Sequence, residues 1–226
     1  MNETASSVND DPSPAPEDML ALVEDQQRSV SGQMGAFVPL ILLAWGVAWL
    51  GGFTALWLVD GLGEAFSLPI EVAAVVFVLL LIGAGVVSVV AGTRSTRGVR
   101  TGKDAAFVGA VYGQAWWIGC LAILGIGRAL VFNGMSEELL SIFYPSAYVF
   151  FAGVMYVLGA ALWRAVPMLV LGLWSIVVSV AAPFAGVPTH FLVFAVAGSA
   201  AWFAGAVWTW VWTRRARRRV ELRGRA

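Results

Sequence analysis

The stretch from Leu68 to Ala91 reads LPIEVAAVVFVLLLIGAGVVSVVA, and its only charged residue is Glu71. About 20 consecutive apolar residues are enough for a helix to cross the hydrocarbon layer of a bilayer, so this stretch predicts a transmembrane helix. Pro69 lies at its start, where the missing N–H of a proline costs no hydrogen bond.

Further apolar stretches of similar length occur on both sides of this one. Together with Leu68–Ala91, the predicted spans are Ala36–Val59, Ala105–Ile126, Ala147–Trp163, Val166–Phe184 and Phe191–Trp212. We therefore predict an all-α fold: a polytopic bundle of six transmembrane helices that occupies residues 36–213.

The composition indicates that lipid is the solvent of this chain. Hydrophobic residues make up 59% of the 226 residues and charged residues 12%, against about 25% charged residues in typical soluble domains. The mean hydropathy is +0.80, and a soluble fold of this length could not bury so much apolar surface. Cys120 is the only cysteine, which excludes an intrachain disulfide and a cluster of thiolate metal ligands.

The positions of arginine and lysine predict the orientation, because the cytoplasmic flanks of membrane spans are enriched in these residues. With a cytoplasmic N-terminus, all 14 basic residues except Arg128 fall on the cytoplasmic side. We therefore expect a multi-pass protein of the bacterial plasma membrane with both termini in the cytoplasm. One kinked helix from Tyr144 to Phe184 would instead give five spans and turn the arginine-rich tail outward, which this asymmetry disfavours.

The two ends of the chain differ in charge. Residues 1–16 are acidic and rich in Ser and Pro, which is typical of a disordered tail, and residues 17–35 predict an amphipathic, acidic cytoplasmic helix. Residues 214–226 form a basic cytoplasmic tail, which we expect to contact lipid phosphates. Nucleic-acid binding is not expected, because no folded domain surrounds these arginines.

Few residues are able to carry chemistry. We expect an ion pair on the outer face between Arg128 and one of three carboxylates: Asp60, Glu64 or Glu71. His190, the only histidine, is expected in a proline-bounded outer loop and cannot by itself form a two-histidine zinc motif. No catalytic, cofactor-binding or metal-binding pattern is present in the sequence, so we expect no enzymatic activity, no metal and no cofactor.

The 11 tryptophans are the most unusual feature. Several lie near span ends, where tryptophan favours the membrane interface. For those at depth, we consider packing against small residues, or lining a cavity that binds an apolar or cationic small molecule, partly through cation–π attraction. The candidate cavity residues are Trp45, Trp49, Phe53, Trp116, Trp117, Trp174 and Trp202.

Small residues indicate where helices can approach closely. Gly109–Gly113 is a GxxxG motif, which supports a packed bundle or a homo-oligomer. Cys120 is expected to be a small packing residue. The sequence GVAW from Gly46 loosely matches GVMY from Gly153 in the oppositely oriented fourth span, which is compatible with a 3+3 inverted repeat of the transporter type.

The longest predicted outer loop is Gly127–Tyr144. It contains SEELLSIF from Ser136 to Phe143, which predicts a short helix capped by Ser136 and lying in the membrane interface. The other outer loops, residues 60–67 and 183–190, are short.

The N-terminal region carries a family resemblance. EDMLALVEDQQR (Glu17–Arg28), followed by AWGVAWLG (Ala44–Gly51), resembles a group of uncharacterised six-helix membrane proteins from high-GC Gram-positive bacteria, some of them labelled transporters. The resemblance covers the N-terminal helix and the first span. It implies no particular site residues.

Two hypotheses for the function follow. The first is a small transporter-like or permease-like bundle that handles an apolar or cationic compound through its tryptophan-lined interior. The second is a non-transporting scaffold or regulatory membrane protein that binds a soluble partner through the acidic helix of residues 17–35.

Overall fold

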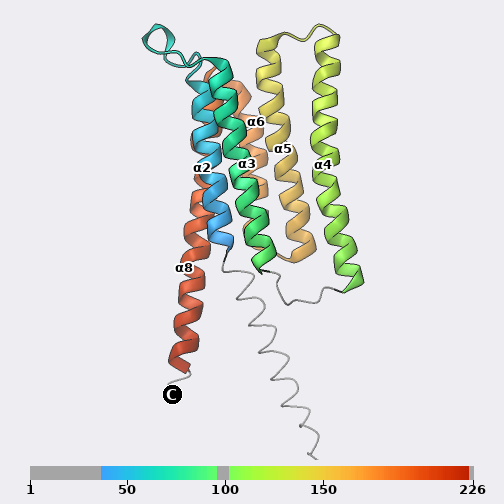
Figure 1. Cartoon of the computed structure of the whole chain (residues 1–226), viewed down its shortest axis with the longest axis vertical. Helices are drawn as coiled ribbons and strands as arrows, with labels where there is room; N and C mark the ends of the chain where they lie inside the picture. The colour runs from blue at the N-terminus through green and yellow to red at the C-terminus, as the bar shows by residue number, and fades with distance from the viewer. Residues whose placement is uncertain (1–36, 96–101, 224–226) are drawn as a thin grey trace, which may run out of the picture.

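A computed structural model of the chain describes residues 37–95 and 102–223 (Figure 1). The predicted acidic tail, the predicted cytoplasmic helix of residues 17–35 and the last residues of the basic tail lie outside this part. The hypothesis that the N-terminal helix binds a soluble partner therefore stays a prediction.

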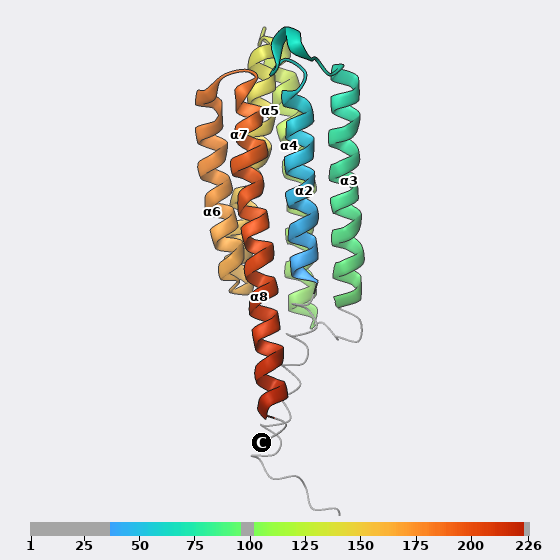
Figure 2. The same cartoon turned by 90° about the vertical axis from the view of Figure 1, so that its left-hand side faces the viewer.

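Long helices joined by short turns make up the described chain. Their bounds are α2 (Val38–Trp57), α3 (Ile70–Ser95), α4 (Lys103–Phe132), α5 (Glu137–Trp163), α6 (Val166–Ala181), α7 (Thr189–Val193) and α8 (Ser199–Arg223). One π-helical turn, Phe194–Gly198, joins α7 and α8 into a single rod, the last span (Figure 2). Six helices in the described residues are thus long and apolar enough to cross a bilayer, which confirms the predicted all-α bundle of a multi-pass membrane protein.

The helix ends follow from local chemistry. Pro39 and Pro167 occupy the first turns of α2 and α6, where no backbone donor is needed. Ser136 caps α5 as predicted, and its Oγ accepts from the Leu139 N–H at 3.3 Å. Arg164 ends α5 in the left-handed conformation, with φ of 52°. This break separates α5 from α6, so the five-span alternative is wrong.

The predicted short interfacial helix of Ser136–Phe143 is wrong, because these residues begin α5, which continues to Trp163. Pro145 lies inside α5 and removes the N–H that would bond the Ser141 carbonyl. His190 of α7 replaces that donor, since its Nε2 lies 3.1 Å from the Ser141 carbonyl oxygen. A donor from another span thus lets the helix run through a proline.

The helices form an open ring. α2 packs on α3 and on the last span, the last span packs on α6, α6 packs on α5, and α5 packs on α4. α3 and α4 stand at the two ends of this series. The core lies between α2, α6 and the last span, and its largest side chains are Trp49, Phe53, Phe194 and Trp202.

Glycine permits the closest backbone contact at the interface of α5 with α6. A Cβ atom at Gly153 would lie 2.8 Å from the Gly172 carbonyl oxygen, so nothing larger than glycine fits. The predicted GxxxG motif plays no such part within the chain. A Cβ at Gly109 or Gly113 would meet nothing within 4 Å, and the homo-oligomer that this motif suggests stays a prediction.

α2 and α5 hold equivalent places in the ring. Each packs on the next helix of the chain and on the last helix of the other half, as a 3+3 repeat requires. The two glycines that match in sequence contact different partners. Gly46 of α2 faces Phe203 of α8, whereas Gly153 of α5 faces α6. The inverted repeat therefore stays a prediction.

Candidate functional site

A cavity of about 720 Å³ lies inside the open ring, between α2, α3, α4 and α5. Small-molecule sites typically measure about 300–1,000 Å³ and have mainly apolar and aromatic walls. The principal lining residues are Trp45, Trp49, Phe53, Phe77, Leu81, Trp116, Cys120, Glu137, Leu140, Ser141, Tyr144, Tyr148, Phe151 and Ala152. Aromatic residues, among them Phe191 of α7, thus make up half of the 18 lining residues.

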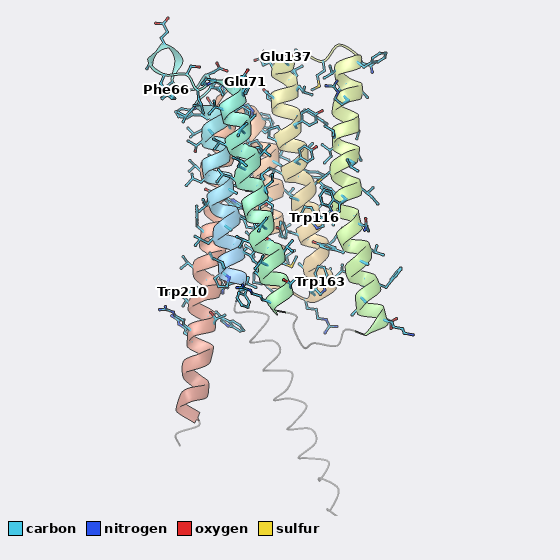
Figure 3. The ribbon with its side chains drawn as sticks, viewed as in Figure 1. Phe66, Glu71, Trp116, Glu137, Trp163 and Trp210 are labelled. Atoms are coloured by element: carbon cyan, nitrogen blue, oxygen red, sulfur yellow. The ribbon has the colours of Figure 1, made fainter. Side chains whose placement is uncertain are left out.

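The cavity occupies one half of the bundle. It reaches from Trp45 in the middle of α2 to Leu56 near the end of that helix. It also reaches Glu137, the first residue of α5, which is labelled in Figure 3. We call this end of the bundle the acidic end, because the described residues there include Asp60, Glu64, Glu71, Glu137 and Glu138, with Arg128 as their basic neighbour. The opposite, arginine end carries Arg94, Lys103, Arg164, Arg214 and Arg215.

A row of aromatic rings lies at the side of the cavity that faces the arginine end. The ring of Trp202 lies 6.0 Å from that of Trp45 and 5.5 Å from that of Tyr156, measured between centroids, and Tyr156 lies 5.8 Å from Trp116. We call these four residues the aromatic floor. They come from α2, α4, α5 and α8, so a path between these rings requires these helices to move apart.

Four of the seven candidate aromatic residues line the cavity. Trp45, Trp49, Phe53 and Trp116 line it, while Trp202 lies behind its wall in the aromatic floor, with 3% of its surface exposed. The other two do not reach the cavity. Trp117 points away from the bundle and is 71% exposed, because it follows Trp116 by only 100° around α4.

Trp174 lies on a different side of the molecule. It borders a separate groove of about 360 Å³ between α6 and α8, and its indole N–H donates to the Ala197 carbonyl at 2.8 Å. The indole therefore links α6 to the π-helical turn of the last span. This hydrogen bond joins two helices and lies outside the cavity between α2, α3, α4 and α5.

The first turns of α5 are the part of the cavity that the sequence analysis missed. Glu137, Leu140, Ser141 and Tyr144 line the cavity, although they were expected in an outer loop. The spacing of Leu140, Tyr144 and Tyr148 by four residues is the signal that α5 begins earlier. Pro145 made this pattern hard to recognise, because a proline usually ends a helix.

Cys120 was expected to pack between helices and instead lies in the cavity wall. Its thiol is free and partly exposed. Since it is the only cysteine of the chain, a thiol reagent can modify the cavity wall at this one position.

The charged residues of the acidic end remain apart. Asp60, Glu64, Glu71 and Arg128 are all exposed, and Arg128 belongs to α4, whose main neighbour is α5. In the described part of the chain, no ion pair joins Arg128 to these carboxylates. Glu71 lies in the first turn of α3, where a carboxylate suits the positive end of the helix dipole.

His190 is not the loop residue that the sequence suggested. It lies in α7 and is fully buried, with 0% of its surface exposed. Its Nδ1 lies 3.2 Å from the Gly186 carbonyl oxygen, which already accepts from the His190 backbone N–H at 2.8 Å. The Ser141 carbonyl has no backbone donor, so we assign the ring proton to Nε2. His190 thus joins the last span to α5.

Comparisons with known proteins found no relative of this chain. The chain matches no protein-family model, no curated protein and no solved structure. The resemblance to six-helix proteins of high-GC Gram-positive bacteria therefore stays a prediction. Within residues 37–95 and 102–223, no three His, Cys, Asp or Glu side chains gather in a way that could hold a metal ion.

Proposed function

We propose that this protein is a small membrane transporter that takes an apolar or cationic small molecule into its aromatic cavity from the acidic end. The cavity of about 720 Å³ between α2, α3, α4 and α5 carries the proposal. Its rings provide the apolar and π contacts that such a molecule needs in place of water.

The aromatic floor supports transport rather than passive leakage. A cavity that reaches one end of the bundle and has an aromatic floor toward the other resembles one of the two states that alternating access requires. The second state would open the floor between Trp45, Trp116, Tyr156 and Trp202, whose rings meet across four helices. Positive-inside asymmetry makes the acidic end the extracellular one, so we propose that the cavity faces outward.

Binding is tested at Cys120. In purified full-length protein, the rate at which N-ethylmaleimide alkylates this single thiol is followed by mass spectrometry. We expect a bound aromatic molecule, such as N-phenyl-1-naphthylamine or ethidium, to slow the alkylation in a saturable manner. If neither compound changes the rate, the cavity is not a site for molecules of this class.

A cavity-filling variant makes this test specific. Leu81 lines the cavity from α3, whereas Leu79 of the same helix is 62% exposed on the outer face. We expect Leu81→Trp to abolish protection of Cys120 and Leu79→Trp to leave it intact, because both variants add the same ring and only one occupies the cavity.

Transport is tested in vesicles. Purified protein is reconstituted with DNA trapped inside the vesicles, and ethidium added outside is followed by its fluorescence on binding the DNA. We expect uptake above that of protein-free vesicles, and uptake by Leu81→Trp equal to the protein-free level. Saturable binding without uptake would make the protein a receptor or sensor for its ligand and refute the transport function.

A further inference from the structure

We infer that the cavity selects organic cations over neutral or anionic molecules of the same shape. This inference rests on the proposed function, because it names the class of ligand that the same cavity accepts. It follows from the chemistry of the groups in the wall and from the position of Glu137.

Four hydrogen-bond donors of the wall have partners within the protein. The indole N–H of Trp45 donates to Ser88 Oγ at 3.0 Å. The hydroxyls of Tyr144 and Tyr148 donate to backbone carbonyls of α4 at 3.4 and 3.3 Å, and the Ser141 hydroxyl donates to a carbonyl of its own helix at 2.7 Å. The other donors of the wall are the indole N–H groups of Trp49 and Trp116 and the weakly donating thiol of Cys120.

The wall offers a ligand the faces of its aromatic rings, the oxygen lone pairs of the bonded hydroxyls and the carboxylate of Glu137. A cation gains from ring faces and from a carboxylate. No lysine, arginine or histidine of the described chain lines the cavity. An anion would therefore lose its water without gaining a positive partner, which is costly in an apolar site.

Glu137 gives the ligand a preferred orientation. It is the one charged residue that lines the cavity, and it lies at the rim, on the first turn of α5 (Figure 3). A molecule with an apolar body and one positive group can place the body against Trp45, Trp49 and Trp116 while its charge stays near this carboxylate. The other carboxylates of the acidic end also raise the local concentration of cations.

Three compounds of the same shape and different charge test the inference. They are tetraphenylphosphonium, neutral tetraphenylsilane and anionic tetraphenylborate, and the readout is protection of Cys120 from N-ethylmaleimide in full-length protein in a nonionic detergent. We expect tetraphenylphosphonium to protect at concentrations at least tenfold lower than the other two. Equal or better protection by tetraphenylborate or tetraphenylsilane overturns the inference and leaves binding itself intact.

A matched pair of variants tests the role of Glu137. Glu137→Gln removes the charge at the rim, and Glu138→Gln removes the neighbouring charge, which does not line the cavity. Because Glu137 is exposed, we expect a loss of about three- to fivefold in affinity for tetraphenylphosphonium, with Glu138→Gln close to the unmodified protein. Equal effects of the two variants would refute a specific role for Glu137.

The same protection assay distinguishes a failure of the proposed function from a failure of the selection by charge. If none of the three compounds protects Cys120 in the unmodified protein or in Glu138→Gln, the cavity binds no molecule of this size, and both proposals fall together. If all three protect equally, only the selection by charge is refuted.

Discussion

The two sides of the cavity are built differently. Within the most apolar 18 residues of each helix, 39% are buried in α2, against 11% in α3 and 6% in α4. α2 is held by α3 and by the last span, while α4 rests mainly on α5. Since α4 shares few contacts with the rest of the bundle, it is the wall that can move with least loss of packing, and α2, α3, α5, α6 and the last span form the scaffold.

The largest expected effect comes from the scaffold. Gly172→Leu places a branched side chain where a Cβ would already lie 2.7 Å from the Gly153 carbonyl oxygen. The two backbones must then separate, and we expect a loss of roughly 3 kcal/mol or more in the free energy of unfolding. Unfolding in mixed micelles with increasing dodecyl sulfate, followed by tryptophan fluorescence, measures it.

The same substitution on a movable wall is the control. Gly113→Leu adds its side chain to open space on α4, so the midpoint of unfolding should not change. A comparable loss in both variants would show that α4 is packed as tightly as the scaffold, and the contrast between the two sides would fail.

The next effect concerns the link between α7 and α5. His190→Ala removes a fully buried ring and leaves the partly buried Ser141 carbonyl without this donor, and we expect a loss of about 2 kcal/mol in the free energy of unfolding. Pro145→Ala restores a backbone N–H to that carbonyl. The double variant should therefore lose less than the sum of the single variants. Strict additivity would mean that His190 stabilises the bundle by packing alone.

A smaller effect is expected at the interface of α2 with α3. Trp45→Phe removes the hydrogen bond from the indole to Ser88 of α3, 3.0 Å long, and Ser88→Ala removes it from the other side. Hydrogen bonds between membrane helices contribute about 0.6 kcal/mol on average, so each variant should lose roughly this amount. The double variant should lose little more than either single one, as a double-mutant cycle would show.

The smallest effect is expected at the lipid-facing surface of α4. Trp117→Leu exchanges one apolar side chain for another at a position that is 71% exposed, and lipid covers both equally well. We expect a change below about 0.5 kcal/mol. Trp49→Leu, at a position only 6% exposed and in contact with Gly198, should be clearly destabilising in the same assay. Equal losses would place Trp117 in an interface.

Local patterns in the sequence predicted most of the fold. Runs of apolar residues, prolines in first turns and the Ser136 cap are local signals, so the six spans and the α5–α6 break could be predicted. The extension of α5 to Glu137 could not, because it depends on a donor from His190, 49 positions away along the chain. A proline inside a membrane-spanning helix is tolerated where another group satisfies the freed carbonyl, as His190 does here.

The candidate site was predicted in part for the same reason. Trp45, Trp49 and Phe53 lie four residues apart, which places them on one face of a helix before any neighbour is known. Trp116 and Trp117 are adjacent, and local sequence could not show which one faces inward. Only the packing of α4 on α5 places Trp116 in the cavity and Trp117 in the lipid.

The sequence by itself determined the number of apolar membrane-spanning helices and the positions of the arginines. Lipid requires long runs of apolar residues, and each run can be recognised without knowing the rest of the fold. The tertiary structure alone decided that the helices form an open ring, that aromatic residues of this ring line a cavity, and that Glu137 is the one charged residue of the described chain in the cavity wall. These features depend on contacts between residues distant in the chain, and such contacts leave no regular pattern in a single sequence.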